Sequence, residues 1–386
     1  MLATLIMAGI YLHIPFCKKA CHYCNFHFST QTGHIQAFVD ALIKEIEIQK
    51  TYLIEPIQTI YFGGGTPSLL DVAQLKSIMD ALYSHFEIAP IIECTLEANP
   101  DDISSVKLAE WKQIGINRLS IGIQSFQAPA LDWMNRAHTV AQSHAAIELA
   151  KVAGIDNLSI DLIYGTPTLS DEALLSDLDW IEKYQIKHVS CYALTVEDKT
   201  ALKKLIEKAQ IEDVNPEKQA SHFEILTTKL KSMGMDHYEI SNFAQPGFRS
   251  QHNSNYWSGV SYLGLGPSAH SFNGVSRQWN IANNALYIQS IANLQLNFEI
   301  EYLTEANRYN EYMMTSLRRM EGFDIDYIES TFGTSYVQHC KNIMESMDAK
   351  NYFSQNGNKI ALNSEAKFLA DGIASDFFIL TTSQSL

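Results

Sequence analysis

Residues 9–26 read GIYLHIPFCKKACHYCNF, and this stretch joins an apolar strand directly to three closely spaced cysteines. The run GIYLHIP is typical of a buried β-strand, because it is rich in β-branched and aromatic side chains and ends at a proline. Cys17, Cys21 and Cys24 follow with the spacing CxxxCxxC. The sequence therefore predicts three thiols on a loop that leaves the C-terminal end of the first strand.

Three cysteines so close together indicate a metal site. Soft thiolates bind iron–sulfur clusters and zinc, and in a reducing compartment such a group binds metal rather than forming disulfides. A 4Fe–4S cluster held by three thiolates keeps one iron open for a further ligand, and this is the site we expect. A structural zinc ion needs four ligands, and the alternative is a zinc site with His13, His22 or His27 as the fourth.

The first 200 residues alternate strand-like and helix-like segments. Helical periodicity runs through residues 35–50, and further helices begin near Asp71 and Asp171. Alternating strands and helices with crossover-length connections predict a parallel sheet with helices outside, curved into a complete or partial βα barrel. The six expected strands lie at 9–15, 57–65, 93–100, 118–125, 157–165 and 188–195.

Polar and glycine residues gather where these strands end. They include the stretch 63–66, Glu97, Asn99, Gln124, Asp161 and Gly165. In α/β folds, sites are built at the carboxyl ends of the strands. The sequence therefore predicts one site formed by several strand ends together with the cysteine loop.

The second half of the chain changes character twice. Residues 200–235 are expected to be helical, and residues 237–280 read as a long loop-like region rich in aromatics, Asn, Ser and Gly. Helical runs at 303–319 and 335–348 then precede Asn356-Gly357, a strong hairpin signal. We expect residues 1–290 to form the barrel domain and residues 291–386 an α+β winged-helix-like domain.

The charge balance bears on the partners. The chain carries a formal net charge of −15, and residues 301–386 hold 7 Lys and Arg against 12 Asp and Glu. Such a field repels phosphate backbones, so we expect no nucleic-acid partner and interpret the winged-helix-like domain as a packing or partner domain.

No transmembrane segment is expected, because no stretch approaches the roughly 20 apolar residues that span a bilayer. Residues 1–10 lack the basic region and cleavage site of a signal peptide, so we expect a cytoplasmic location. The three remaining cysteines are expected to be small buried hydrophobes. They are Cys94, Cys191 and Cys340.

The cysteine motif resembles that of the radical S-adenosylmethionine (SAM) superfamily, including an aromatic residue, Tyr23, before the last cysteine. Further motifs are similar in order and spacing to the oxygen-independent coproporphyrinogen III oxidase family. They are YLHIPFC (11–17), GGGTP (63–67), LEANP (96–100), SIGIQSF (120–126), NR (135–136), SIDLIYGTP (159–167) and GLGPSAHS (264–271). The resemblance implies a partial (β/α)6 TIM barrel whose cysteines hold a 4Fe–4S cluster with SAM at the open iron.

The same resemblance implies roles for individual residues. Tyr11 is expected to lie against the cluster or SAM, and Gly64, Gly65 and Thr66 to contact its methionyl part. Residues expected to hold its carboxylate, ribose or further groups are Glu97, Gln124, Arg136 and Asp161, with Ala193 and His270 lining the pocket. Without the resemblance, the glycines read as a tight turn, the carboxylates as solvated strand ends and Arg136 as a surface ion pair.

Two branches of this family differ in chemistry. The oxidases decarboxylate two propionates of coproporphyrinogen III, whereas HemW-like proteins resemble haem chaperones. Three features favour the chaperone branch: Phe26 stands where the oxidases carry a further cysteine, only 16 residues precede Cys17, and residues 252–257 read HNSNYW, similar to an HNxxYW signature. The oxidase activity remains the alternative, and whether SAM is cleaved or only bound is left open.

The chaperone interpretation implies haem as cargo, with His252 as the axial ligand and Tyr256 and Trp257 near the porphyrin face. Imidazole is a suitable ligand for haem iron. A loop histidine hydrogen-bonded to the backbone is the alternative, and three other histidines compete. They are His237, His270 and His339. Expected partners are haem or porphyrin and haem-accepting proteins, with peripheral contact to membrane proteins and a homodimer as options. A third hypothesis is a zinc-stabilised scaffold unrelated to haem.

Overall fold

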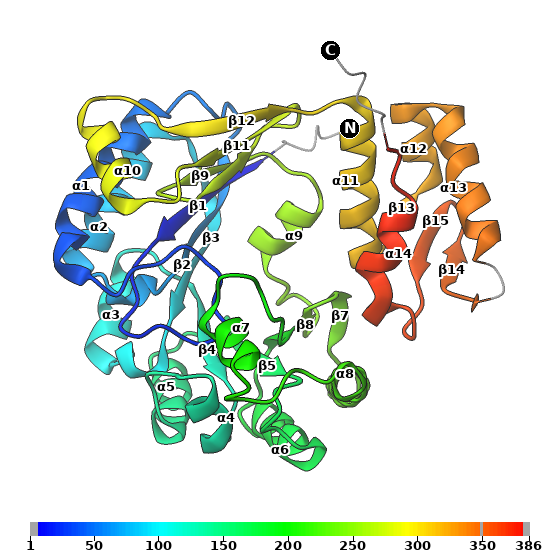
Figure 1. Cartoon of the computed structure of the whole chain (residues 1–386). Coiled ribbons are helices and arrows are strands. Elements are labelled where there is room, and N and C mark those ends of the chain that lie inside the picture. Colours follow the sequence, from blue (N-terminus) through cyan, green and yellow to red (C-terminus); the bar gives the residue numbers. More distant parts are fainter. Residues whose placement is uncertain (1–6, 348–349, 381–386) are drawn as a thin grey trace.

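A computed structural model describes residues 7–347 and 350–380, and Figure 1 shows two packed bodies joined along one side. The larger body is built on a twelve-stranded sheet with the order β12-β11-β10-β9-β1-β2-β3-β4-β5-β6-β8-β7. The smaller body packs its own core against a three-stranded sheet. The fold is α/β, as predicted, with an α+β body at its C-terminal end.

Six consecutive parallel strands form the centre of the large sheet, each followed by a helix on the outer face. All six strands predicted from the sequence are confirmed, and the parallel pairing runs unbroken from the first to the sixth. Their bounds are β1 Ala8–Ile14, β2 Ile57–Gly64, β3 Ile88–Ala98, β4 Arg118–Gln124, β5 Leu158–Tyr164 and β6 His188–Ala193.

The outer helices begin at residues that cap them. In α2 (Val72–His85) the Asp71 carboxylate accepts from the Gln74 backbone and the Gln74 side chain returns the bond, which satisfies two exposed helix-end groups. In α6 (Asp171–Lys183) the cap is Ser170, one residue before the expected start. The other outer helices are α1 Ile35–Ile48, α3 Ser105–Gln113, α5 Val140–Val152 and α8 Pro216–Ser232. Two short helices, α4 Ala128–Trp133 and α7 Ala201–Glu207, lie instead beside the cysteine loop, where they share an apolar cluster with Tyr23.

Residues 237–280 are not the long loop that the sequence suggested. They extend the sheet on both sides, with two short strands beside β6 and three beside β1. These strands are three to five residues long, too short for alternation to be legible, and long-range pairing stabilises them. Their bounds are β7 Asp236–Glu239, β8 Asn242–Ala244, β9 Tyr262–Leu265, β10 His270–Phe272 and β11 Ser276–Asn280, with α9 Gln251–Trp257 between.

The smaller body has the helices and hairpin expected of a winged-helix-like domain. Strands β14 (Phe353–Asn356) and β15 (Lys359–Leu362) form the hairpin, and Gly357 supplies the left-handed backbone with a φ of 63°. Strand β13 (Phe323–Asp324) pairs with β15. The helices are α11 Glu305–Arg318, α12 Ile325–Phe332, α13 Thr334–Ser346 and α14 Ala370–Asp376.

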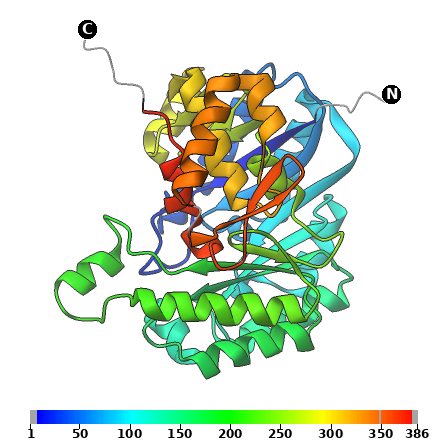
Figure 2. The ribbon, with the colours of Figure 1, turned by 90° about the vertical axis from the view of Figure 1, so that its right-hand side faces the viewer.

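The sequence places the boundary between the two domains at residues 290/291, and this boundary stays a prediction. Helix α10 (Asn284–Ala292) packs on α1, and β12 (Phe298–Tyr302) pairs with β11, so the large sheet continues to residue 302. The second core begins with Tyr309. Polar contacts join the bodies, including a 2.9 Å hydrogen bond from Lys367 Nζ to the His237 carbonyl. Figure 2 shows the C-terminal helices in front of the barrel.

No helix among the described residues is both long and apolar enough to cross a membrane.

Candidate functional site

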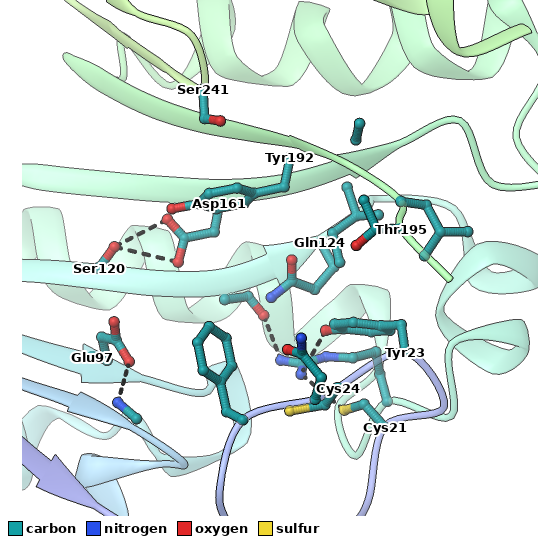
Figure 3. A pocket seen from close by; sticks show the side chains of 18 of the residues that line it. Cys21, Tyr23, Cys24, Glu97, Ser120, Gln124, Asp161, Tyr192, Thr195 and Ser241 are labelled. Carbon is teal, nitrogen blue, oxygen red and sulfur yellow. Dashed lines mark hydrogen bonds between the residues drawn. The ribbon is translucent and has the colours of Figure 1, made fainter. Parts of the chain in front are cut away.

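A cavity of about 570 Å³ opens at the carboxyl ends of the parallel strands. Its volume falls in the range of small-molecule and cofactor sites. Figure 3 shows Cys21 and Cys24 at one end and Ser241 at the other. The cavity brings together twelve of the predicted residues: Cys17, Cys21, Tyr23, Cys24, Gly64, Gly65, Thr66, Glu97, Gln124, Arg136, Asp161 and Ala193. We refer to it as the cysteine pocket.

Backbone hydrogen bonds position the cysteine loop over the strand ends. The Cys17 amide donates to the Ser29 carbonyl at 3.0 Å, and the His22 amide donates to the Met134 carbonyl at 3.1 Å. All three thiols are partly exposed to the cavity. Burial raises the pKa of the Cys17 thiol, and it raises the pKa of Cys24 to about 11. Burial therefore favours the protonated thiol at Cys17 and Cys24 in the absence of metal, and both must deprotonate to bind iron.

Arg136 links the cysteine loop to the strand ends. One terminal nitrogen, Nη2, donates to the Asn99 Oδ1 at 2.8 Å and to the Gly122 carbonyl at 2.7 Å. The other, Nη1, lies 3.2 Å from the Cys21 sulfur and 3.4 Å from the Tyr23 hydroxyl. This guanidinium is therefore not a surface ion pair, and its Nε–H is buried without a partner among the described residues.

The three histidines considered as a fourth zinc ligand each have a ring nitrogen bonded to a neighbouring residue. Nε2 of His13 is bonded to the His27 carbonyl, and Nδ1 of His22 to the Trp133 carbonyl. Nε2 of His27 is bonded to the Asn284 side chain. Within the described part of the chain, no three His, Cys, Asp or Glu side chains are grouped to hold one metal ion. A 4Fe–4S cluster fits this donor set better, because each thiolate binds a separate iron and the ligands stand wider apart.

The glycine triplet brings the end of β2 against the cysteine-bearing chain. Gly64 has a φ of 104°, and a Cβ there would lie 2.6 Å from the His13 ring. A Cβ at Gly65 would lie 2.7 Å from the Phe16 carbonyl oxygen. Only glycine permits both approaches. The triplet is thus required by the packing of β2 on the loop, and it also exposes backbone to the pocket.

Two carboxylates lie below the cysteines, in the interior of the barrel. Glu97 accepts from the Tyr61 hydroxyl at 2.8 Å and from the Gly64 amide at 3.2 Å, while Asp161 accepts from the Ser120 hydroxyl at 3.0 Å. Burial raises the pKa of Glu97 to about 7 and also raises the pKa of Asp161. Neither carboxylate is a solvated strand end, because each is desolvated and held by named donors.

Gln124 occupies an unusual backbone conformation at the end of β4. Its φ is 67°, and the register between β4 and β5 shifts between Ile121 and Gln124. Left-handed backbone at a residue other than glycine is costly and concentrates at functional sites. The irregular strand end turns the Gln124 side chain into the pocket, as Figure 3 shows.

Five of the predicted residues lie outside the cysteine pocket. Tyr11 lies within the barrel, where its hydroxyl is 3.2 Å from His13 Nδ1 and its ring is 6.1 Å from that of Tyr61. His252 also faces the barrel interior. The other three, Tyr256, Trp257 and His270, line a separate groove of about 530 Å³ between the β10–β11 end of the sheet and α11. We refer to it as the aromatic groove.

Several lining residues of the cysteine pocket are absent from the predicted site residues, and two of them hold predicted side chains. Asn99 holds Arg136, and Ser120 holds Asp161. The signal for Ser120 is strand parity: it alternates with Gly122 and Gln124, so all three face the same side of β4. The partnership of Asn99 with Arg136 joins residues 37 positions apart, and no local pattern reports it.

The fold and the cysteine pocket define a radical SAM protein. Residues 11–181 match a family model described as the Radical SAM superfamily. The solved structure of coproporphyrinogen III oxidase (HemN) from Escherichia coli superposes with a TM-score of 0.83 at 22% identity, covering 96% of this chain and 90% of that one. At this identity the superposition establishes the fold alone, and the fold class predicted from the sequence is confirmed.

Relatives narrow the class to one family. The heme chaperone HemW of Lactococcus lactis is 32% identical over 373 residues, which cover 94% of this chain and 97% of the relative. The heme chaperone HemW of Bacillus subtilis is 32% identical over 376 residues, covering 96% and 99%. The chain belongs to the HemW family of radical SAM proteins. Membership implies a 4Fe–4S cluster and SAM as cofactors.

Proposed function

We propose that this chain is a haem chaperone, which binds haem as cargo and delivers it to haem-accepting proteins. The observation that carries the proposal is the name heme chaperone, borne by relatives that align with 94% and 96% of this chain. Phe26, in place of a further cysteine, and the HNSNYW stretch at 252–257 point the same way. The proposed compartment is the reducing cytosol, where an iron–sulfur cluster and free thiols are maintained.

We assign Cys17, Cys21 and Cys24 as the cluster ligands. A reduced cluster, when bound, supplies an electron to the sulfonium group of SAM. The role of the chain is to hold the thiols in place, and Arg136 does this from the side by its contact with Cys21. The guanidinium charge also offsets the negative charge that accumulates on thiolates.

We assign the remaining pocket residues to SAM. The free Nε of Arg136 can donate to the SAM carboxylate, and Glu97 can accept from its ammonium group. Asp161 is placed to accept from ribose hydroxyls, and the backbone at Gly64, Gly65 and Thr66 to contact the methionyl part. The strained Gln124 and Ala193 line the cavity beside them. Tyr11 acts indirectly, because its hydroxyl contacts the His13 ring that packs on Gly64.

The test combines two measurements on one anaerobically reconstituted sample. Haem is titrated and followed by its Soret absorption, and coproporphyrinogen III is then added with SAM and a reductant. We expect saturable haem binding and no formation of protoporphyrinogen. Conversion of the porphyrinogen would identify the oxidase instead, and a colourless sample that retains zinc would identify a zinc scaffold.

A further inference from the structure

We infer that the haem cargo binds in the aromatic groove, with His270 as its axial ligand from the sheet and Met314 facing it from α11. This inference rests on the proposed chaperone function and names the site that function uses. It gives His270 a cargo role in place of the SAM contact implied by the resemblance. Both residues line the groove together with Trp257 and Trp279.

His252, the histidine of the HNSNYW stretch, is committed to the interior of the barrel. Its Nδ1 lies 2.9 Å from the Thr59 hydroxyl, and its ring stacks on Tyr61 with centroids 5.0 Å apart. The N-terminal backbone of α9 is bound to β3, because Glu93 of that strand accepts from the His252 amide at 3.0 Å. These contacts hold the partly buried ring against the barrel strands, so His252 anchors α9 to the barrel.

Two of the three competing histidines are also engaged. Nε2 of His237 bonds the Ile240 carbonyl at 3.0 Å, and its ring stacks on Phe243 at 4.1 Å. Nε2 of His339 bonds the Phe377 carbonyl at 2.9 Å inside the smaller body. His270 differs from both: it is exposed, and neither ring nitrogen has a hydrogen-bond partner among the described residues. It is the exposed histidine of this set, whereas His237 is buried and His252 and His339 are partly buried.

The walls of the groove suit a flat apolar ligand. The His270 ring stacks beside Trp279 with centroids 6.0 Å apart, so the sheet side offers two nearly parallel rings. Tyr256 and Trp257 also line the groove, with their rings packed edge to face, and Met314 lines the α11 side. A histidine and a methionine on opposite walls form a known ligand pair of haem iron.

Among the charged side chains of the groove, Arg277 is the one that can bind a haem propionate. Glu311 accepts from Arg277 Nε at 2.6 Å, and Glu301 accepts from the Asn307 side chain at 3.3 Å, so both carboxylates are engaged. The two terminal nitrogens of Arg277 have no hydrogen-bond partner among the described residues. They can donate to a carboxylate in a bidentate manner.

The groove is also connected to the cysteine pocket. The guanidinium of Arg318 lies 4.9 Å from the Trp257 ring centroid, and Arg318 also lines the cysteine pocket. One residue of the pocket lining therefore packs on one residue of the groove lining, at the junction between the barrel and the smaller body.

The experiment is a ferric haem titration of the full chain, monitored by Soret absorption. His270→Gly is compared with His252→Gln, which keeps a side chain able to bond Thr59, and with His339→Gln as a matched control. We expect His270→Gly to weaken haem binding on the order of tenfold to a hundredfold and to shift the spectrum. Added imidazole should restore that spectrum, and Met314→Leu should change the spin state with a smaller loss of affinity.

The outcomes separate the two proposals. A wild-type chain that binds no haem contradicts the chaperone function itself. If the wild type binds haem but His270→Gly binds equally well, the assignment of the groove is wrong and the function stands. Loss of binding in His252→Gln with an unchanged melting temperature would locate the ligand inside the barrel instead. Since the His270 side chain makes no hydrogen bond to the described part of the chain, its replacement is not expected to disturb folding.

Discussion

The cysteine pocket and the aromatic groove are built by one sheet but from different parts of it. The pocket lies where the parallel strands end together. Its charged groups are held by hydrogen bonds with nearby side chains, as Tyr61 donates to Glu97 and Arg136 donates to Asn99. The groove lies where antiparallel strands β10 and β11 face α11, and its aromatic rings stand open to solvent. Strand direction accounts for this difference: the parallel strands bring polar side chains of several strand ends into one buried site, whereas the antiparallel strands present aromatic rings along one face.

The largest effect is expected from removing the three cluster ligands, which should abolish the iron–sulfur cluster and leave haem binding in the groove intact. Replacing Cys17, Cys21 and Cys24 by serine removes the soft ligands, so we expect no iron–sulfur absorption after anaerobic reconstitution. Haem binding should persist, because no cysteine lines the groove. Iron and sulfide analysis together with a haem titration checks both halves. A variant that still assembles a SAM-binding cluster would contradict the assignment of these ligands.

The second prediction concerns Glu45, which ties the groove strands to α1. Its fully buried carboxylate accepts from the Gly266 amide at 2.8 Å, the Tyr287 hydroxyl at 2.6 Å and the Asn280 side chain at 2.7 Å. Glu45→Ala leaves these donors unpaired, and we expect a loss of about 3–5 kcal/mol in the free energy of unfolding.

Denaturant unfolding measures this loss, and Glu45→Gln is the control, because an amide oxygen still accepts part of the network. The haem affinity of Glu45→Ala should fall more than its SAM affinity. An equal fall in haem affinity and SAM affinity would show that Glu45 supports both sites rather than the groove alone.

A smaller effect is a pH dependence confined to the cysteine pocket. Burial, reinforced by Asp161 and opposed by Tyr61, Gly64 and Arg118, sets the pKa of Glu97 at about 7. As the pH falls through this value the carboxylate gains a proton and loses its attraction for the SAM ammonium. The SAM affinity of the cluster-loaded protein should fall by up to about tenfold between roughly pH 8 and pH 6.

Equilibrium dialysis with labelled SAM measures the SAM affinity at each pH. Glu97→Gln should bind SAM more weakly than the wild type, with an affinity that does not change over this pH range. Haem binding in the groove should stay level over the same window, because burial lowers the pKa of His270 from its ordinary value. A flat wild-type SAM profile would show that Glu97 does not hold the ammonium group.

The smallest effect is expected at Phe26, which lines the mouth of the cysteine pocket with 66% of its side chain exposed. Phe26→Ala should change the free energy of unfolding by less than about 0.5 kcal/mol, because little apolar area is uncovered. Thermal melting measures this change. Phe26→Cys should not confer porphyrinogen oxidation, and if it did, this single position would separate the two branches of the family.

The sequence predicted the six parallel strands and the cysteine loop because both depend on local patterns. Strands such as β5 (LSIDLIY) are rich in apolar and β-branched residues and are bounded by turns, and the thiol spacing is compact. The SAM residues Tyr23, Glu97 and Arg136 came from motif resemblance, and the structure brings them together at one cavity. Their roles remain proposals.

The sequence could not predict the sheet extension at 237–280 or the inward orientation of His252. The extension is held by pairing between distant segments, as when β9 joins β1. The environment of His252 depends on Thr59 and Tyr61, which are nearly 200 positions away. Contacts of this kind are properties of the tertiary structure, and a motif gives the identity of a residue but not the direction of its side chain.

The position of β1 between β2 and β9 has a consequence for biosynthesis. Gly9–Leu12 pair with Tyr262–Leu265, so the strand that leads to the cysteines keeps an open edge until most of the chain has left the ribosome. Non-local parallel pairing of this kind forms slowly. A truncated chain that lacks β9 would therefore leave one edge of β1 unpaired.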